Sequence, residues 1–416
     1  MRAPPKRVVV VGGGFAGLHL IRHLDRLVDR TEVELTLIDR NNYHLFTPLL
    51  YQVATGELPP HAVAYPLRMP IARARWQFAR TEVASIDLDG HLVRTADGEF
   101  PYDHLVLVPG SVTNDYGIPG VWEHAVGMKW LGDAQQLRRR IIGAFERAAL
   151  EGDPARRGEL LRFVIVGAGP VGVELASSLR DLMDHTLRQL FPSVDLRRHA
   201  EIVLIDGADR VLSQMDERLS RLAARRLERQ RVRVVLRTLV SEIGDGEVRA
   251  KDGSMFRGAT IVWAGGVRTN PIVSGLEGVP HAKDGRLVVD ECFRAGGRDD
   301  LITFGDAAFF PHDGRPLPQL AQVAVVQAPQ AARNVAHLVR GEPLEPYRHR
   351  ERGDLIALGR TNAGARIGGA VFGGFPAWSV WRIYYLMQLL GVRNRATLLV
   401  EWLLSYFVTR MVADTP

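Results

Sequence analysis

The sequence of 416 residues predicts an α/β protein that contains the same parallel-sheet unit twice, the second inserted in the first, followed by a helical C-terminal segment. Three observations carry this prediction. An apolar strand, a glycine-rich turn and a helix occur twice, with Gly12 and Gly167 155 positions apart (167 − 12). A glycine after the last strand of each copy keeps that offset, at Gly110 and Gly265. The tail has a different character, with many aromatic residues and flanking arginines.

The first glycine-rich turn follows an apolar strand and has the spacing Gly-x-Gly-x-x-Gly, at Gly12, Gly14 and Gly17. The first glycine permits the tight turn, the second lets the backbone approach a pyrophosphate, and the third lets the helix pack against the strand. The N–H groups at the start of the helix then face the phosphates. Asp39 ends the next strand, where its carboxylate can accept both hydroxyls of an adenosine ribose. This pattern predicts a Rossmann-like dinucleotide-binding domain.

The next segment, residues 41–56, is expected to be loop-like in its early part, with Pro48 in the first turn of a short helix. Most of its large apolar residues should pack in the core, namely Tyr43, Phe46, Leu49 and Leu50. The flavin end of a bound dinucleotide would also lie here. Residues 67–127 are predicted to form strands and hairpins, with a hairpin turn at Asp97-Gly98.

A helix is predicted over residues 133–150, because apolar residues recur on one face, at Leu137, Ile141, Ile142 and Phe145. The polar stretch 151–158 is expected to be a surface loop. A second amphipathic helix is predicted over 216–230, with Leu219, Leu222, Ala223 and Leu227 facing inward.

The second glycine-rich turn, at Gly167, Gly169 and Gly172, opens a helix predicted from residue 171 to 190. The following strand ends at Asp206, the counterpart of the first ribose acid. Asp206 lies 34 residues after Gly172 (206 − 172), against the usual ~20, so an insertion is expected around Phe191-Pro192.

A strand and turn at 301–308 and a helix that includes residues 321–327 come after the second unit. We therefore expect the returning chain to complete the first domain. The expected boundaries are 1–128 and 290–355 for the two parts of the first domain, 129–289 for the second domain, and 356–416 for the tail.

Composition narrows the possible functions. The net charge is +6 (53 − 47), and the basic residues are almost all arginines spread along the chain, so nucleic acid is not predicted as a partner. Cys292 is the single cysteine, which excludes disulfides, Cys-rich metal sites and a redox dithiol within the chain. It is expected to be a small buried residue in a strand-like stretch. No metal site, no signal peptide and no apolar run of ~20 residues is found, which indicates a cytoplasmic chain.

The tail is rich in tryptophan, tyrosine and leucine, and arginines flank or interrupt it at 382, 393, 395 and 410. Its longest apolar run, residues 398–408, contains Glu401 and is too short to span a bilayer. We expect its helices to lie in a membrane interface, where apolar burial and attraction to anionic lipid add together. A dimer interface or a lid over the core is the alternative.

With these motifs in view, nearly the whole chain resembles the type II NADH:quinone oxidoreductases. The resemblance is carried by Asp39–Phe46 with Pro48–Ala54, Trp263–Arg268, Phe304–Asp306 and Ala321–Ala324, and by the tail from Ala377 to Arg410. It implies FAD in the first domain, NADH in the second, and a membrane quinone (menaquinone or ubiquinone) as acceptor without proton pumping. It also implies a peripheral homodimer on the cytoplasmic face of the inner (plasma) membrane.

The resemblance assigns roles to particular residues. Asp306 would bond the ribityl–phosphate region of FAD, and Gln322 would border the flavin ring and the quinone pocket. Glu174 matches a carboxylate near the nicotinamide and flavin, although an acid early in a helix is also favoured by the helix dipole. Glu174 and Gln322 are thus the expected catalytic residues. The expected cofactor-binding positions are these two with Gly12, Gly14, Phe15, Ala16, Gly17, Asp39, Arg40, Pro48, Val83, Gly110, Gly167, Gly169, Pro170, Val171, Gly172, Asp206, Ala264, Gly265, Gly266, Asp306 and Ala321.

The sequence departs from the family pattern at three places. Pro109 stands where a threonine is usual, and Asp206 stands where a glutamate is commoner. The quinone-side pattern Ala-Gln-x-Ala-x-Gln ends here in Val326, and a glutamine follows one position later, at Gln327. One position on a helix is a rotation of ~100°, so Gln327 cannot replace the usual glutamine.

Two other functions share this architecture. One is a soluble NAD(P)H oxidase or a ferredoxin or rubredoxin reductase, against which the aromatic tail argues. The other is an NADH-sensing flavoprotein without enzymatic turnover, in the manner of apoptosis-inducing factor. A disulfide reductase would need a cysteine pair near residues 45–55, which is absent, and the same absence argues against a sulfide:quinone oxidoreductase.

Overall fold

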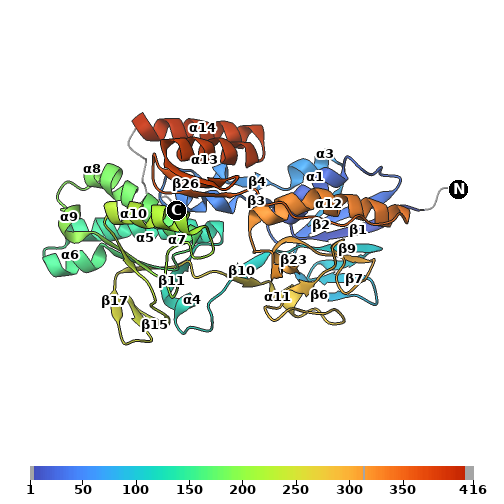
Figure 1. Cartoon of the computed structure of the whole chain (residues 1–416), viewed down its shortest axis with the longest axis horizontal. Helices are drawn as coiled ribbons and strands as arrows, with labels where there is room; N and C mark the ends of the chain where they lie inside the picture. Colours follow the sequence, from blue (N-terminus) through green and yellow to red (C-terminus); the bar gives the residue numbers. More distant parts are fainter. Residues whose placement is uncertain (1–3, 313, 408–416) are drawn as a thin grey trace. The chain divides into compact units, whose positions relative to one another are not determined.

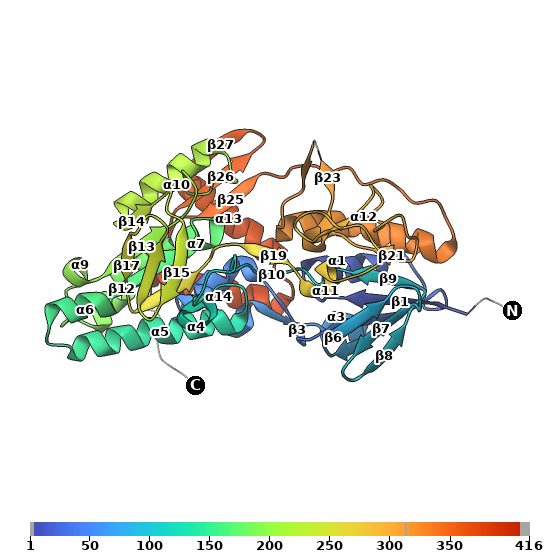
Figure 2. The ribbon, with the colours of Figure 1, turned by 90° about the horizontal axis from the view of Figure 1, so that it is seen from below.

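The computed structural model describes residues 4–312 and 314–407. The chain forms two compact units, each built from three segments (Figures 1 and 2). The first unit comprises Met1–His44, Pro66–Val112 and Val267–Glu351, and the second comprises Leu45–Tyr65, Thr113–Gly266 and Arg352–Pro416. The chain passes from one unit to the other at β3 (Tyr43–Leu45), β4 (Ala64–Pro66), β10 (Ser111–Thr113) and β19 (Val267–Thr269).

A parallel five-stranded sheet forms the centre of the first unit, in the order β21-β9-β1-β2-β5. The strands are β1 (Lys6–Val11), β2 (Val33–Asp39), β5 (Gln77–Arg80), β9 (His104–Leu107) and β21 (Leu301–Ile302). Val8–Val11 is a continuous buried run, as expected for a strand covered on both faces. Helix α1 (Phe15–Leu24) packs against α12 (Ala321–Arg340), which ends at Gly341 with φ +68°.

The other elements of the first unit are short. An antiparallel sheet contains β6 (Val83–Asp87), β7 (Leu92–Thr95) and β8 (Gly98–Pro101). The predicted hairpin is confirmed, but its two-residue turn is Ala96-Asp97, one position before the expected Asp97-Gly98. The remaining elements are α3 (Arg68–Arg73), α11 (Pro271–Ser274), β20 (Leu287–Val288), η4 (Gly305–Ala307), β22 (Ala308–Phe309), β23 (Pro311–His312) and β24 (Arg315–Pro316).

The second unit contains a parallel sheet in the order β11-β18-β12-β13-β14. Its strands are β11 (Ala125–Gly127), β12 (Arg162–Val166), β13 (Glu201–Ile205), β14 (Val232–Val235) and β18 (Thr260–Trp263). The second unit also contains two antiparallel sheets. One is formed by β15 (Val240–Gly244), β16 (Glu247–Ala250) and β17 (Met255–Arg257). The other is formed by β25 (Asp354–Ala357), β26 (Ala363–Ile367) and β27 (Ala370–Gly374).

Helices of the second unit include two that were predicted from periodicity, α5 (Leu131–Leu150) and α10 (Glu217–Arg229). The expected face of α5 is buried, and on α10 only Leu222 of the expected set is partly exposed. The others are η1 (Thr47–Leu49), α2 (Leu50–Ala54), η2 (Pro60–Ala62), α4 (Val121–His124), α7 (Pro170–Leu182), α9 (Leu196–His199), α13 (Phe375–Gln388) and α14 (Val392–Phe407). Pro48 lies in the first turn of η1, as predicted.

Two local predictions were wrong, and a third was correct in extent but not in uniform winding. The stretch 151–158 is not all loop, because α6 (Pro154–Leu160) begins there with Asp153 as N-cap, its side chain accepting the Ala155 N–H. The segment 41–46 includes the strand β3. The helix predicted over 171–190 changes winding after Leu182, through the π-helical η3 (Met183–Leu187) and then α8 (Arg188–Leu190).

Cys292 also differs from expectation. It lies in a turn after β20 and is half-buried rather than buried. Its N–H donates to Asp290 Oδ1 (2.9 Å) and its carbonyl accepts from Asn334 Nδ2 (3.1 Å), so the backbone of this turn is satisfied on both sides. Burial raises the pKa of the thiol, which keeps it protonated and unreactive near neutral pH.

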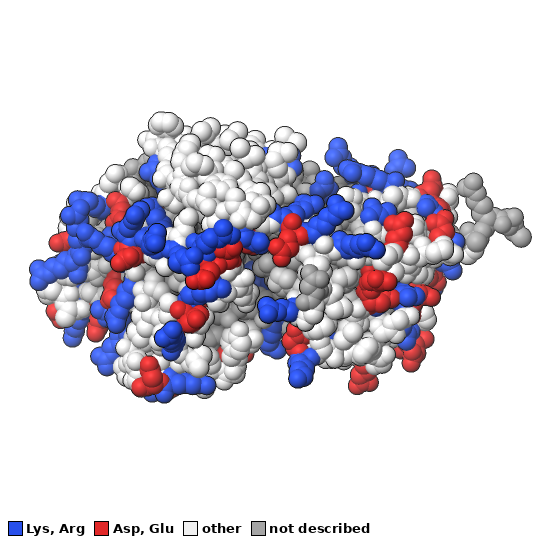
Figure 3. All heavy atoms as spheres, in the orientation of Figure 1, with Lys and Arg blue, Asp and Glu red and all other residues white. Residues whose placement is uncertain are grey.

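Helices α13 and α14 carry most of the large apolar side chains that the second unit exposes. They include Phe375, Ile383, Met387, Val392, Leu399, Val400, Leu403, Leu404 and Phe407. In Figure 3 the surface over these helices shows almost no charge, and basic side chains, drawn in blue, gather below it. Among the described residues no helix is long and apolar enough to cross a membrane. Arg410 lies outside the described residues.

Candidate active site

The first glycine-rich turn connects β1 to α1, and its glycines are required by close approach of backbone atoms. Gly12 has φ +107°, and a Cβ on it would lie 2.3 Å from the carbonyl oxygen of Val108. A Cβ on Gly17 would lie 1.9 Å from the carbonyl oxygen of Gly12. Any side chain at either position would open the turn. Gly14 faces open space, where a Cβ would meet nothing within 4 Å.

Asp39 at the end of β2 braces this turn. Its Oδ2 accepts the Gly13 N–H at 2.7 Å, and its Oδ1 accepts the Asn41 N–H at 2.7 Å. Burial raises the pKa of Asp39, and these two N–H donors oppose that shift. Each oxygen keeps a further lone pair, so the carboxylate can still accept ribose hydroxyls.

The second glycine-rich turn, between β12 and α7, repeats this geometry. Gly167 has φ +110°, and a Cβ on it would lie 2.3 Å from the carbonyl oxygen of Ala264, while one on Gly172 would lie 1.8 Å from that of Gly167. Asp206 accepts the N–H of Ala168 and, at 2.8 Å, the N–H of Ala208. Ala168 is 155 positions after Gly13 (168 − 13), so the internal repeat extends to the hydrogen bond that braces each turn.

The two turns fit a dinucleotide each. Gly169 opens α7 as Gly14 opens α1, and a Cβ on either would meet nothing within 4 Å, so a phosphate could approach the backbone. In the first unit His44 is buried, and neither ring nitrogen has a hydrogen-bond partner. Burial lowers the pKa of His44 to about 4, against a smaller opposing effect of the Gly13 backbone, so the ring is neutral. A buried neutral imidazole whose ring nitrogens make no well-formed hydrogen bond, beside Gly13 of the turn, fits a bound polar group there.

The Phe304–Asp306 motif is held by a glutamine that sequence reasoning had set aside. Gln327 is buried in α12, and its Oε1 accepts the N–H of Gly305 at 2.9 Å. Gly305 has φ +68°. Ser111 Oγ donates to Asp306 Oδ2 at 2.6 Å. Gln327 thus supports the turn that contains Asp306. Its side chain points into the core, in agreement with the expectation that Gln327 does not replace the usual quinone-side glutamine.

Ala321, Gln322 and Val326 lie at the start of the same helix, and all three are partly exposed. Val326 follows Gln322 by four residues, so the two share a face of α12, one turn apart. This face is rotated by about 100° from the one that buries Gln327. The family pattern ends in a polar glutamine, and this chain has the apolar Val326 at that position.

Glu174 lies in the first turns of α7 and is only 7% exposed. Its Oε1 accepts the N–H of Ala357, in β25, at 3.0 Å. Burial without a cationic partner raises the pKa of Glu174 to about 8, so the carboxyl group is mainly protonated at neutral pH. A buried carboxyl group with a pKa in this range can give and recover a proton.

Two tyrosines face the same buried region. Burial raises the pKa of Tyr51 (α2) and of Tyr385 (α13) well above the usual value, and the charge of Glu174 adds to the shift of each. Tyr51 accepts a hydrogen bond from Gln52 Nε2 at 3.1 Å. Gln52 Oε1 accepts in turn from Trp402 Nε1, in α14, at 2.9 Å. The environment of Glu174 therefore includes residues of both C-terminal helices.

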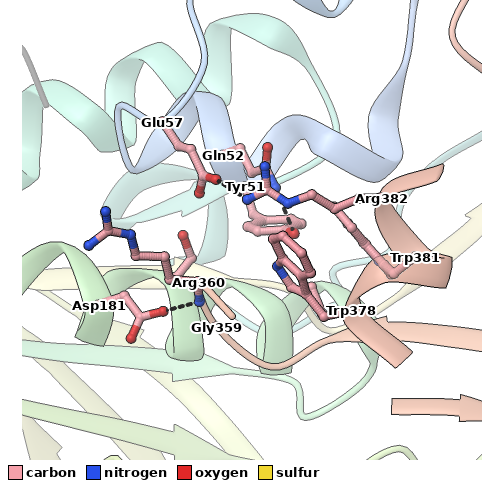
Figure 4. Close-up of a pocket in the computed structure, with 11 residues that line it drawn as sticks. Tyr51, Gln52, Glu57, Asp181, Gly359, Arg360, Trp378, Trp381 and Arg382 are labelled. Atoms are coloured by element: carbon pink, nitrogen blue, oxygen red, sulfur yellow. Dashed lines mark hydrogen bonds and ion pairs between the residues drawn. The ribbon is translucent and has the colours of Figure 1, made fainter. Parts of the chain in front are cut away.

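A small cavity of about 10 Å³, room for one water molecule, lies beside Tyr51 and Gln52 (Figure 4). Arg382 of α13 lines it and forms an ion pair with Glu57 (3.5 Å). The Arg382 guanidinium also stacks on Trp402, 4.3 Å from the ring centroid, and donates to the Tyr406 hydroxyl at 3.1 Å. Because this charge is largely buried and paired, it anchors the two helices to the segment that follows α2.

The remaining expected positions divide between the units. Those in the first unit are Phe15 and Ala16 in α1, Arg40 after β2, Val83 in β6 and Gly110 after β9. Arg40 lies 3.8 Å from Glu82, and Phe15 lies edge-on to His44. Those in the second unit are Pro48 in η1, Pro170 and Val171 in α7, and Ala264, Gly265 and Gly266 after β18.

Sequence reasoning missed Tyr51, Tyr385 and Ser111 as members of these sites. Tyr51 had a signal, since it lies in the Pro48–Ala54 motif, but Tyr385 was one aromatic residue among many in the tail. In the described residues no group of three or more His, Cys, Asp or Glu side chains could hold a metal ion.

Comparison with known proteins gives the family. The pyridine nucleotide-disulphide oxidoreductase family matches residues 6–328. The type II NADH:quinone oxidoreductase Ndh of Mycobacterium tuberculosis is 34% identical, over 98% of this chain and 90% of the relative. The chain belongs to this family of type II oxidoreductases. The type II NADH:quinone oxidoreductase of Staphylococcus aureus (strain NCTC 8325) is 31% identical, over 85% of the chain and 88% of the relative.

Solved structures confirm the α/β fold. The structure of NDH2 from Plasmodium falciparum in complex with NADH matches with a TM-score of 0.89, covering 98% of this chain and 99% of that one. The identity is 16%, so this likeness concerns the fold alone. The family resemblance seen in the motifs is therefore confirmed by sequence over nearly the full length.

The environment of Asp206 predicts a preference for NADH over NADPH. A 2′-phosphate within ~5 Å of the carboxylate would cost about 3 kcal/mol at an effective dielectric of 20, which is over 100-fold in kcat/KM. Arg210 does not offset this, because its guanidinium donates to the carbonyls of Ser213 (2.6 Å) and Met215 (3.1 Å). Steady-state kinetics should therefore give the same preference in Arg210→Ala. Equal efficiency with NADPH in the unmodified enzyme would contradict this.

Proposed function

We propose that this chain oxidises NADH with FAD and passes two electrons to a membrane quinone without pumping protons. One proton from solvent completes the balance, since NADH, H⁺ and quinone become NAD⁺ and quinol. The flavin, when bound, supplies the exchange between a hydride donor and an electron acceptor. The single observation that carries the proposal is the pair of braced glycine-rich turns in a chain of the type II family.

In this proposal FAD binding, NADH binding and proton transfer are assigned to different residues. Asp39 and the turn before α1 bind FAD, with Asp306 held in place by Ser111 and Gln327. Asp206 and the turn before α7 bind NADH. Glu174 holds a proton in a buried site. In this assignment residues 1–128 and 290–355 are the FAD-binding domain, and 129–289 is the NADH-binding domain inserted in it. The compact units divide the chain differently, because residues 45–65, 113–128 and 352–355 belong to the second unit and residues 267–289 to the first.

An acceptor panel tests the proposal. The FAD-loaded protein should oxidise NADH rapidly with menaquinone and ubiquinone analogues, and slowly with oxygen or a disulfide. Turnover with oxygen that equals turnover with quinones would favour an oxidase, and flavin reduction without multiple turnovers would favour an NADH sensor.

The acceptor site is proposed at Gln322 and Val326. A glutamine at 326 could donate a hydrogen bond to a quinone carbonyl, worth about 0.5–1.5 kcal/mol, so Val326→Gln should lower the quinone KM by up to tenfold. Anaerobic reduction of the flavin by NADH should not change. Val325→Gln is the matched control, since the same change there points about 100° away. If Gln322→Ala and Val326→Gln both leave quinone kinetics unchanged, the quinone binds elsewhere.

The membrane contact is proposed at α13 and α14, whose apolar side chains are exposed together. Ile383 and Leu403 are 64% and 54% exposed, and neither is needed for the core. Replacing both with glutamate should reduce partitioning to anionic liposomes by at least about 100-fold, since each side chain contributes about 1.5–3 kcal/mol when it enters the lipid. Flotation of the FAD-loaded protein measures this.

A control variant tests whether the effect is specific to the exposed apolar face of α13 and α14. Leu150, at the end of α5, is 90% exposed, so Leu150→Glu makes the same chemical change away from α13 and α14 and should float normally. Salt should weaken binding of the unmodified protein by screening its arginines. Normal flotation of the double variant with loss of a dimer would assign the face to the homodimer interface. From the family resemblance we further propose that the protein acts at the cytoplasmic face, as a peripheral homodimer.

A further inference from the structure

A basic groove lies in the second unit, at the end of the parallel sheet where the strands β12, β13 and β14 begin. Its volume is about 590 Å³. Arg162 begins β12, and Arg231 immediately precedes β14. Arg180 comes from α7, and Arg197 and Arg198 come from α9, which packs beside α6 at this edge (Figure 1). We call these five arginines and the space between them the arginine groove. They are spread over 70 positions of the sequence (231 − 162 + 1), so they do not form a basic motif that the sequence alone would reveal.

The positive charge of the groove is only partly neutralised. Arg162 forms an ion pair with Glu201 (2.6 Å), the acidic residue in the lining, and Arg180 bonds Asp184 through Nε (2.9 Å). Arg197, Arg198 and Arg231 form no ion pair within the described part of the chain, and all three are exposed. Three unpaired guanidinium groups around one concavity concentrate a positive potential there.

The lining indicates what kind of anion fits. A guanidinium group can donate two parallel hydrogen bonds to two oxygens of one phosphate, which the single ammonium group of a lysine cannot do as well. The volume is that of a small-molecule site. His199 has the only aromatic ring among the described lining residues, and it is buried, so the groove offers no platform on which a base could stack. The uncharged lining residues are small (Pro154, Ala155, Gly158 and Ala200), which gives a lipid chain little apolar surface.

The groove is distinct from the dinucleotide site of the same sheet. The glycine-rich turn and Asp206 follow the carboxyl ends of β12 and β13, and the groove lies at their amino ends. Five residues of β12 separate the two, which is about 16 Å. A ligand in the groove therefore need not displace NADH.

We propose that the arginine groove binds a compact di- or oligophosphate, through the phosphate groups alone, at a second anion site separate from the NADH turn. Phosphate groups occur in free metabolites and in lipid headgroups, and the small, polar lining assigns the groove to the free form.

The test uses tripolyphosphate and the full-length FAD-loaded protein, with saturating NAD⁺ to occupy the dinucleotide turn. Calorimetry should show one site per chain, and Arg197→Ala/Arg198→Ala should weaken it at least tenfold. Arg225→Ala/Arg229→Ala removes the same charge from exposed positions of α10 and should bind normally. Equal weakening in both double variants would mean non-specific attraction, and no binding to the unmodified protein would overturn the proposal.

Two further measurements distinguish the other ligands. ATP should bind no more tightly than tripolyphosphate, since no base contact is expected, and much tighter binding of ATP would overturn the proposed mode of recognition. Phosphatidylglycerol vesicles should bind Arg197→Ala/Arg198→Ala as they bind the unmodified protein. If this variant loses vesicle binding while tripolyphosphate binds neither protein, the groove is a lipid contact and the proposal is wrong.

Discussion

Asp39→Ala should purify as a folded protein with little FAD and less than about 1% of the unmodified NADH–quinone turnover. The carboxylate would accept two ribose hydroxyls, and hydrogen bonds to a charged group contribute about 1.5–3 kcal/mol each. Losing two such bonds weakens FAD binding by roughly 10²–10⁴-fold. The substitution also frees the N–H groups of Gly13 and Asn41, so the turn that receives the pyrophosphate loses its brace. The flavin-to-protein ratio from absorbance measures the effect.

The repeat supplies the matched control. Asp206→Ala removes the equivalent brace from the second turn, with its bonds to Ala168 and Ala208. This variant should keep its FAD and show a raised KM for NADH. Full flavin occupancy in Asp39→Ala, or loss of flavin from both variants alike, would contradict the assignment of the first turn to FAD.

The features that sequence predicted are those set by short spacing. Three glycines within six positions and an acid at the end of the next strand define each turn, because backbone contacts such as Gly17 to Gly12 are local. The repeat offset of 155 then located the second turn, even with an insertion before Asp206. The amphipathic helices α5 and α10 were predicted for the same reason, since their burial follows a regular period.

The features that sequence did not predict depend on distant partners. Glu174 and Ala357 are 183 positions apart, and Gln52 and Trp402 are 350 apart, so no local pattern announces either bond. Gln327 had the right residue type for the quinone motif, but the helix directs it inward to Gly305. The α6 helix was missed because its polar residues show no apolar period, although Asp153-Pro154 is a helix start signal.

Glu174→Gln should separate proton transfer from hydride transfer. Glutamine has the shape of the protonated carboxyl group and can keep the bond to the Ala357 N–H. NADH should therefore reduce the flavin at a nearly normal rate in a stopped-flow experiment. Quinone turnover should fall about 10²–10⁴-fold, the usual contribution of a positioned proton donor. The unmodified enzyme should lose quinone turnover as the pH rises through about 8, and the residual activity of the variant should not follow that profile.

The same substitution has a consequence for stability whose sign follows from the raised pKa. Between its ordinary pKa of 4.5 and about 8, the Glu174 carboxyl group binds more protons in the folded than in the unfolded chain, so stability falls as pH rises across this window. Each pH unit corresponds to about 1.4 kcal/mol, and the loss is complete above pH 8. Glu174→Gln does not titrate, so its stability relative to the unmodified protein should increase by a few kcal/mol from pH 5 to pH 9. Denaturation midpoints of both FAD-loaded proteins at pH 5, 7 and 9 measure this. Parallel curves would mean that the buried carboxyl group titrates normally, and Glu174 would then only position its neighbours Tyr51 and Tyr385.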